Sequence, residues 1–115
     1  MSLGPLNANV EPIKSLAFGS ISASFAKVGT PLAYPSRLLI ISNGTDKNML
    51  FSIDGTNTHY FVPSQTSQVL DLNANRDGNK NSFVFAKGTQ FWVKQVEAPT
   101  SGSVYVSNTY GVING

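Results

Sequence analysis

Hydrophobic positions along this chain recur in short runs with a period of two, which is typical of half-buried β-strands. The clearest example is 89–110, TQFWVKQVEAPTSGSVYVSNTY, where apolar and polar residues alternate on both sides of a loop. Aromatic and β-branched residues favour strands on both arms, and the intervening EAPTSG supplies turn-forming residues. The pattern predicts two strands joined as a C-terminal β-hairpin.

Similar short runs fill the rest of the chain. Residues 14–28 alternate on both sides of Gly19, which predicts one bent strand or two short ones. The continuous apolar run RLLIIS at 37–42 indicates a central strand. Further strands are expected at 48–54, 58–62, 67–72 and 82–86. About eight short antiparallel strands at roughly ten-residue spacing predict an all-β, single-domain β-sandwich of jelly-roll-like form.

The N-terminal residues lack this periodicity. Residues 1–13 hold two prolines and several small polar residues, which predicts a flexible N-terminal arm ahead of a β-sandwich domain at 14–115. The chain of 115 residues has the length of one domain with a single modest core. We expect part of the arm to become ordered on a neighbouring molecule.

Charge is sparse, at 12% of residues, with eight Lys or Arg against six Asp or Glu and a net charge of +2. Such a small, scattered excess argues against nucleic acid or an anionic membrane surface as a partner. The absence of cysteine excludes a disulfide framework and thiolate metal sites. No apolar run approaches the ~20 residues of a membrane helix. We therefore expect no cofactor, no nucleic-acid partner and no membrane partner.

The sequence offers little for catalysis, and no catalytic residue is predicted. His59 is the single histidine, and no serine lies in a Gly-x-Ser-x-Gly elbow. Most carboxylates fall in or beside predicted turns; Asp54 and Asp77 precede glycines, where aspartate serves the turn itself. We expect His59 to be a strand residue packing partly against the sheet. The glycines lie singly, so no phosphate-binding loop is formed.

The polar segment 73–84 matches the calcium-loop pattern in part. Asn73, Asn75 and Asp77 take its first, third and fifth places, with Gly78 sixth. However, Val84 stands where a bidentate glutamate is needed, and one carboxylate is too few for tight calcium binding. We interpret the segment as a polar surface turn and predict no metal site.

The aromatic residues of the terminal hairpin suggest a binding surface. If Val96 faces Ser103, Lys94 lies opposite Tyr105, with Trp92 further along the same face. Exposed Trp92, Lys94 and Tyr105 could then stack on a sugar or on another protein. The alternative is that both faces of the hairpin are covered, by a second sheet or a subunit, or that the register is shifted by one residue.

Several segments resemble small virion proteins of tailed bacteriophages, over about residues 11–110. They are GTQFWVK at 88–94, APTSGSVYV at 98–106, Tyr110-Gly111, ISNGTD at 41–46, FSIDG at 51–55 and FVP at 61–63. The resemblance implies a non-enzymatic structural component of the head (decoration or completion), neck or tail, assembled in the bacterial host cytoplasm. Its implied partners are copies of itself and other virion proteins. No binding or catalytic residue is carried over.

The sequence also permits two other classes of function. A carbohydrate-binding β-sandwich module would use Trp92 and Tyr105 to bind a glycan. A small hydrolase would have to depend on His59.

Overall fold

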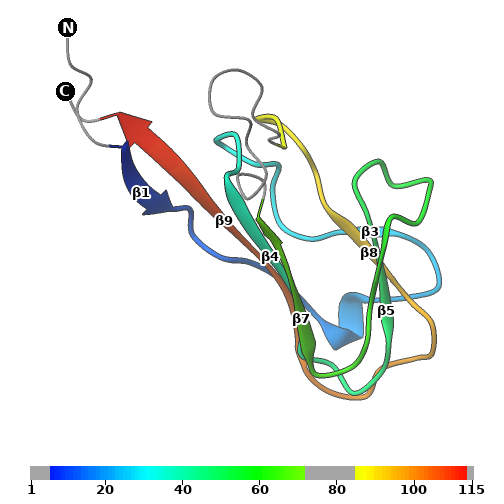
Figure 1. The fold of residues 1–115 in the computed structure, drawn as a ribbon. Helices are drawn as coiled ribbons and strands as arrows, with labels where there is room; N and C mark the ends of the chain where they lie inside the picture. Colours follow the sequence, from blue (N-terminus) through cyan, green and yellow to red (C-terminus); the bar gives the residue numbers. More distant parts are fainter. Residues whose placement is uncertain (1–5, 72–84, 114–115) are drawn as a thin grey trace, which may run out of the picture.

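The computed structural model describes residues 6–71 and 85–113 of the chain. These residues form nine antiparallel strands in two sheets and one short 3-10 turn, η1 (Phe18–Ser20), which confirms the predicted all-β sandwich (Figure 1). The strands are β1 (Leu6–Val10), β2 (Lys14–Ala17), β3 (Ala26–Lys27), β4 (Leu38–Asn43), β5 (Met49–Ser52), β6 (Tyr60–Val62), β7 (Thr66–Asp71), β8 (Trp92–Gln95) and β9 (Ser103–Ile113).

The two sheets divide the chain without following its order. Sheet A has the strand order β1-β9-β4-β7, with β2 also paired to β9; sheet B has the order β3-β8-β5-β6. The apolar run predicted to be central is β4, which pairs with β9 on one side and β7 on the other. The expected turn at Asp54-Gly55 joins β5 to β6 as a hairpin.

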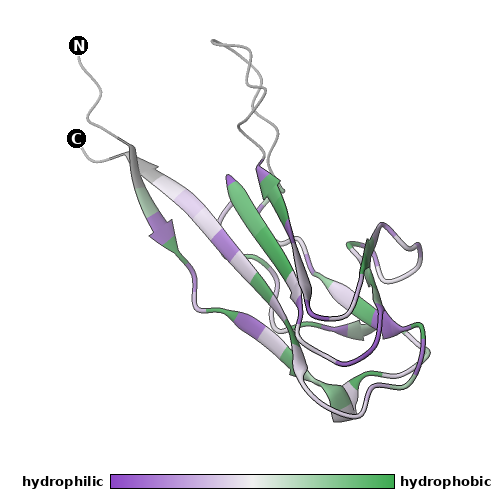
Figure 2. Ribbon diagram, turned by 60° about the horizontal axis from the view of Figure 1, so that its bottom comes forward, coloured by the Kyte–Doolittle hydropathy of each residue, from purple (hydrophilic) through white to green (hydrophobic). Residues whose placement is uncertain are grey.

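On the long strands every second side chain points into the space between the sheets and helps to fill it. Along β4 every second side chain is buried, and the same holds at the start of β9. Each fully buried Leu, Ile, Val, Phe or Met side chain contributes about 1.5–3 kcal/mol. Figure 2 shows apolar positions on the strands and also in several of the connecting segments. The core consists of Ile21, Val28, Leu32, Leu39, Ile41, Met49, Phe51, Val62, Phe91, Val93, Val104 and Val106.

The predicted C-terminal hairpin is wrong. β8 pairs with β3 and β5 in sheet B, whereas β9 pairs with β1, β2 and β4 in sheet A. The connecting loop 96–102 therefore crosses from one sheet to the other. Thr100 fixes it to the β4–β5 loop by donating its backbone N–H, at 2.8 Å, and its hydroxyl to the Asp46 carboxylate. β8 and β9 both show the predicted alternation of apolar and polar residues, but they pair with different strands in different sheets.

Gly102 ends this crossing loop in a conformation that only glycine tolerates well. Its φ is +87°, and a Cβ placed there would lie 2.0 Å from the carbonyl oxygen of Gly44. The Gly44 N–H in turn donates to the Ser103 carbonyl at 2.8 Å. Figure 1 shows the two loops together at the bottom of the view. Close backbone approach at Gly102 is what allows β9 to enter sheet A beside β4.

The N-terminal segment has a different form from the flexible arm predicted for residues 1–13. Leu6–Val10 form β1, paired with the end of β9, so the predicted boundary at residue 13 falls within sheet A. Between the pair Val10↔Thr109 and the pair Lys14↔Val106 the N-terminal strand has three residues, whereas β9 has two. β1 and β2 are thus one edge strand interrupted by a bulge that contains Pro12, a residue without an N–H to donate.

β9 is long enough to leave the body of the sandwich. Its 11 residues span about 36 Å, and its pairing with β4 ends at Thr109. Beyond that point it pairs with β1, and the two form what we call the β1–β9 ribbon, Leu6–Val10 with Thr109–Ile113. The ribbon is the part of sheet A that projects beyond the body of the sandwich (Figure 1), and the molecule measures 55 × 24 × 22 Å.

We expect Gly102→Ala to lower the free energy of unfolding by more than about 3 kcal/mol, because a strained φ is combined with a backbone clash that cannot relax. Gly88→Ala is the matched control, since Gly88 also has a positive φ, +92°, but open space around its Cβ position. It should cost only about 1–2 kcal/mol. If urea unfolding showed the same loss of unfolding free energy for Gly102→Ala and Gly88→Ala, the assigned Gly102–Gly44 contact would be contradicted.

Candidate functional site

The structure separates the three residues predicted to form one binding surface. Trp92 and Lys94 lie on the outer face of sheet B, on either side of the buried Val93. Tyr105 is on β9 and lies on the outer face of sheet A, opposite Ser15 and Ser42. The predicted platform of Trp92, Lys94 and Tyr105 is therefore wrong, because it depended on β8 and β9 being neighbours.

Trp92 has little free ring surface for a sugar. The Lys27 ammonium lies 5.6 Å from its ring centroid. Gly55, in the β5–β6 loop, packs against the six-membered ring, since a Cβ built on it would lie 2.8–3.1 Å from three ring atoms. Stacking of a sugar requires an open aromatic face, and this loop covers one.

The outer face of sheet B combines aromatic rings with cations. The Lys94 ammonium lies 4.6 Å from the ring centroid of Phe25, and Leu50 is paired with both Lys94 and Phe61. Phe61 is 53% exposed. Sequence reasoning missed Phe25, Lys27 and Phe61 because their neighbours come from other strands. We define the sheet B outer face as Phe25, Lys27, Leu50, Phe61, Trp92 and Lys94.

The outer face of sheet A is almost without charge. It comprises the positions that alternate with the buried ones on β4, and on β9 as far as Thr109, together with their direct partners on β1, β2 and β7. Among these described positions Asp71 alone is charged, at the end of β7. We define the sheet A outer face as Val10, Ser15, Ala17, Leu38, Ile40, Ser42, Ser67, Val69, Asp71, Ser103, Tyr105, Ser107 and Thr109.

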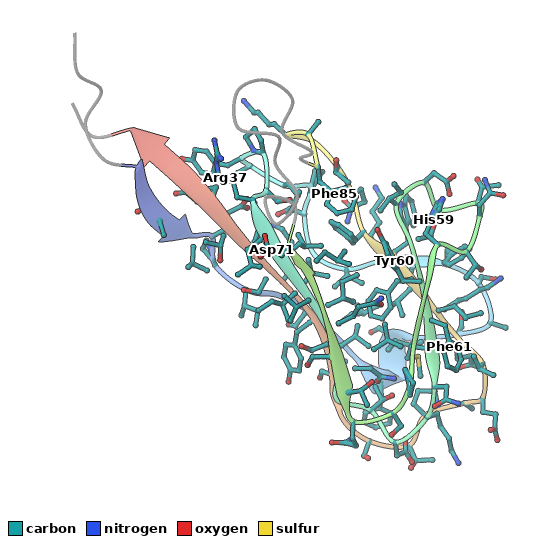
Figure 3. All side chains as sticks on the ribbon, viewed as in Figure 1. Arg37, His59, Tyr60, Phe61, Asp71 and Phe85 are labelled. Atoms are coloured by element: carbon teal, nitrogen blue, oxygen red, sulfur yellow. The ribbon has the colours of Figure 1, made fainter. Side chains whose placement is uncertain are left out.

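His59 was expected on a strand, but it lies in the β5–β6 loop. Its Nδ1 accepts the Ile53 N–H at 3.1 Å, and its Nε2 is 3.9 Å from the Asp54 carboxylate. Asp54 accepts the N–H groups of Asn57 and Thr56, each at 2.8 Å, and these bonds hold the pKa of Asp54 well below its usual range. Asp54 thus serves its turn, as predicted. Figure 3 places His59 and Phe61 on the sheet B side and Asp71 on the sheet A side.

Glu11, within the bulge, is a buried charge that the sequence did not reveal. Its carboxylate accepts the N–H groups of Ala33 and Tyr34, each at 3.2 Å, and the side-chain amide of Asn108. The Lys14 ammonium lies 3.6 Å away. Burial acts to raise the pKa of Glu11, but the hydrogen bonds from Asn108 and Ala33, together with the charge of Lys14, outweigh it and lower the pKa.

Two concavities flank this bulge. A shallow groove of about 380 Å³ is lined by Glu11, Pro12, Ile13, Lys14, Ser15, Gly29, Thr30 and Ala33. At the base of the ribbon the rings of Tyr34 and Tyr110 stack with centroids 3.9 Å apart, beside a cavity of about 130 Å³ that Arg37 also lines. Glu11 and the tyrosine pair together connect the ribbon to the body of the sandwich.

The loop tested against the calcium pattern, 73–84, lies outside the described residues. Elsewhere, within 6–71 and 85–113, no group of three His, Asp or Glu side chains is placed to hold a metal ion. The same part of the chain contains no helix long and apolar enough to cross a bilayer.

Comparison with protein-family models, with curated proteins and with solved structures gives no match in any of the three. Function is therefore inferred from the surfaces and edges of the sandwich together with the sequence resemblance.

Glu11→Gln should destabilise the protein at neutral pH by about 1–3 kcal/mol, because hydrogen bonds to a charged group are lost. The folded pKa of Glu11 lies below its ordinary value of 4.5, so its stabilisation is complete above pH 4.5 and is lost as the pH falls towards the folded pKa. The difference in unfolding free energy between parent and variant should therefore shrink below pH 4.5. A constant difference would contradict the assigned role of the carboxylate.

Gly55→Ala should alter the fluorescence of Trp92, the only tryptophan in the chain, because the added methyl group pushes the β5–β6 loop off the indole ring. We expect a shift in the wavelength of the emission maximum, which reports the solvent exposure of the indole ring. Gly88→Ala, which introduces the same methyl group into open space, should leave the spectrum unchanged. Identical spectra for both variants would show that Gly55 does not cover the ring.

Proposed function

We propose that this chain is a non-enzymatic structural component of a tailed-bacteriophage virion, at the head, neck or tail, acting through repeated contacts with copies of itself and other virion proteins. The resemblance over about residues 11–110 supports this setting. The observation that carries the proposal is the β1–β9 ribbon.

The ribbon has edges suited to a neighbouring subunit. β1 is the end strand of sheet A, and β9 has no pairing with β4 beyond Thr109. Neither Leu6–Val10 nor Thr109–Ile113 contains a charged residue or a proline. Monomeric proteins usually protect edge strands with such residues, and two-stranded ribbons have marginal stability alone. A strand from a neighbour would satisfy the open edge and stabilise the ribbon.

The other edges of the described sandwich are protected. β3 has two residues, one of them Lys27; β6 has three residues and is followed by Pro63; and β7 ends at Asp71. Short strands, charges and prolines are the usual devices against strand pairing between molecules. This contrast supports the ribbon as the edge at which assembly occurs.

Immunogold electron microscopy of phage particles, purified from cultures of the source, tests the proposal directly. An antibody against this protein should label the particles at one fixed position. The proposal would be overturned if purified particles contained none of this protein although the lysate contained it in folded form.

Ala8→Lys should abolish incorporation into particles, because a lysine on the exposed ribbon strand opposes pairing with a neighbour. Ala8 is exposed and lies opposite Gly111, so the variant should keep the parent's melting temperature. Ala23→Lys, at an exposed position outside the ribbon, is the matched control and should be incorporated normally in a complementation assay. Normal incorporation of Ala8→Lys would contradict the role of the ribbon.

A further inference from the structure

The sheet A outer face has the chemistry of an interface rather than of a solvated surface. An antiparallel sheet with one face in water normally carries charged and polar residues there. Among the described positions of this face, hydroxyl and aliphatic side chains predominate, and the charge of Asp71 lies at its margin. Depletion of charge is the compositional sign of the central part of a protein–protein interface.

Aliphatic side chains lie on two neighbouring strands of this face, β4 and the edge strand β7. Ile40 on β4 is directly opposite Val69 on β7, and Leu38 lies two residues along on the same side. Val69 is 58% exposed. Hydroxyl groups border this stripe, including those of Ser42 and Ser67, whose oxygens are 2.8 Å apart. Exposed apolar side chains beside uncharged hydrogen-bonding groups are the composition expected of a protein–protein interface.

The same chemistry favours one occupant, a second copy of this chain. A hydroxyl group donates one hydrogen bond and accepts two, so a face of hydroxyl and aliphatic groups is complementary to itself. By contrast, Lys27 and Lys94 lie on the sheet B outer face, where two copies would bring like charges together at a cost. Flat sheet faces can pack on one another at a separation of about 10 Å.

We propose that the sheet A outer face binds the same face of a second copy in a two-fold symmetric contact that includes Ile40 and Val69. The inference deepens the proposed function, on which it rests, by naming one partner and one surface. The contact uses the face of sheet A, whereas the proposed function uses the edge of the ribbon; Val10 and Thr109 belong to both surfaces.

Sedimentation velocity over a range from micromolar to millimolar protein tests the contact. The parent should show a reversible monomer–dimer equilibrium. Val69→Arg should weaken dimerisation at least about tenfold, because an unpaired cation would be buried in each copy. Phe61→Arg is the matched control, an equally exposed apolar position on the opposite sheet (53% exposed), and should dimerise like the parent.

Thiol labelling gives a second measurement that does not require disruption of the contact. The chain contains no cysteine, so Val69→Cys and Phe61→Cys each introduce a single reactive group. Alkylation of the thiol at position 69 should slow as protein concentration rises, whereas the rate at position 61 should not change. Equal concentration dependence at both positions would overturn the assignment of the face.

The possible outcomes separate this inference from the proposed function. A parent protein that stays monomeric throughout, or a Val69→Arg variant that dimerises as the parent does, overturns the inference. If Ala8→Lys abolishes self-association and Val69→Arg does not, copies associate through the ribbon and the inference fails, while the proposed function stands. Absence of the protein from particles overturns the proposed function even where the dimer forms.

Discussion

The arrangement of the molecule depends on the close approach of two loops at one end of the sandwich. Gly102 packs against the backbone of Gly44 at a distance that excludes any side chain on Gly102, and the backbone around both residues is hydrogen-bonded. This contact directs the chain into sheet A immediately after β8 has completed its pairing in sheet B. The two faces, the shared core and the projecting end of β9 all follow from that change of sheet.

Most strand positions could be predicted from the sequence, β1 excepted, whereas strand partners could not. The alternation of Val104 and Val106 with polar neighbours reports that one side of β9 is buried, but not against which sheet. Trp92 and Lys94 were correctly expected on one face because they lie two residues apart on one strand. Tyr105 was misplaced because its position depended on pairing between strands, and Glu11 was missed because a bulge is visible only once the register is known.

The two outer faces differ in ways that bear on assembly. One carries lysines held over aromatic rings, while the other is nearly free of charge, and the ribbon adds a third surface of a different kind. A two-fold contact by itself closes into a dimer, whereas its combination with a second, independent contact generates extended arrays. A small domain with separate surfaces of this kind is suited to the repetitive symmetry of a particle.

The register of the ribbon also determines how the molecule responds to force. Leu6 lies opposite Ile113, so both ends of the described chain leave the fold at the same tip. Tension applied between these ends would act across the strands, perpendicular to their direction, and would break the inter-strand hydrogen bonds one pair at a time. The unzipping would reach the buried Glu11 only after all of β1 had detached. The bulge would therefore act as the mechanical stop that shields the sandwich from a pull on its termini.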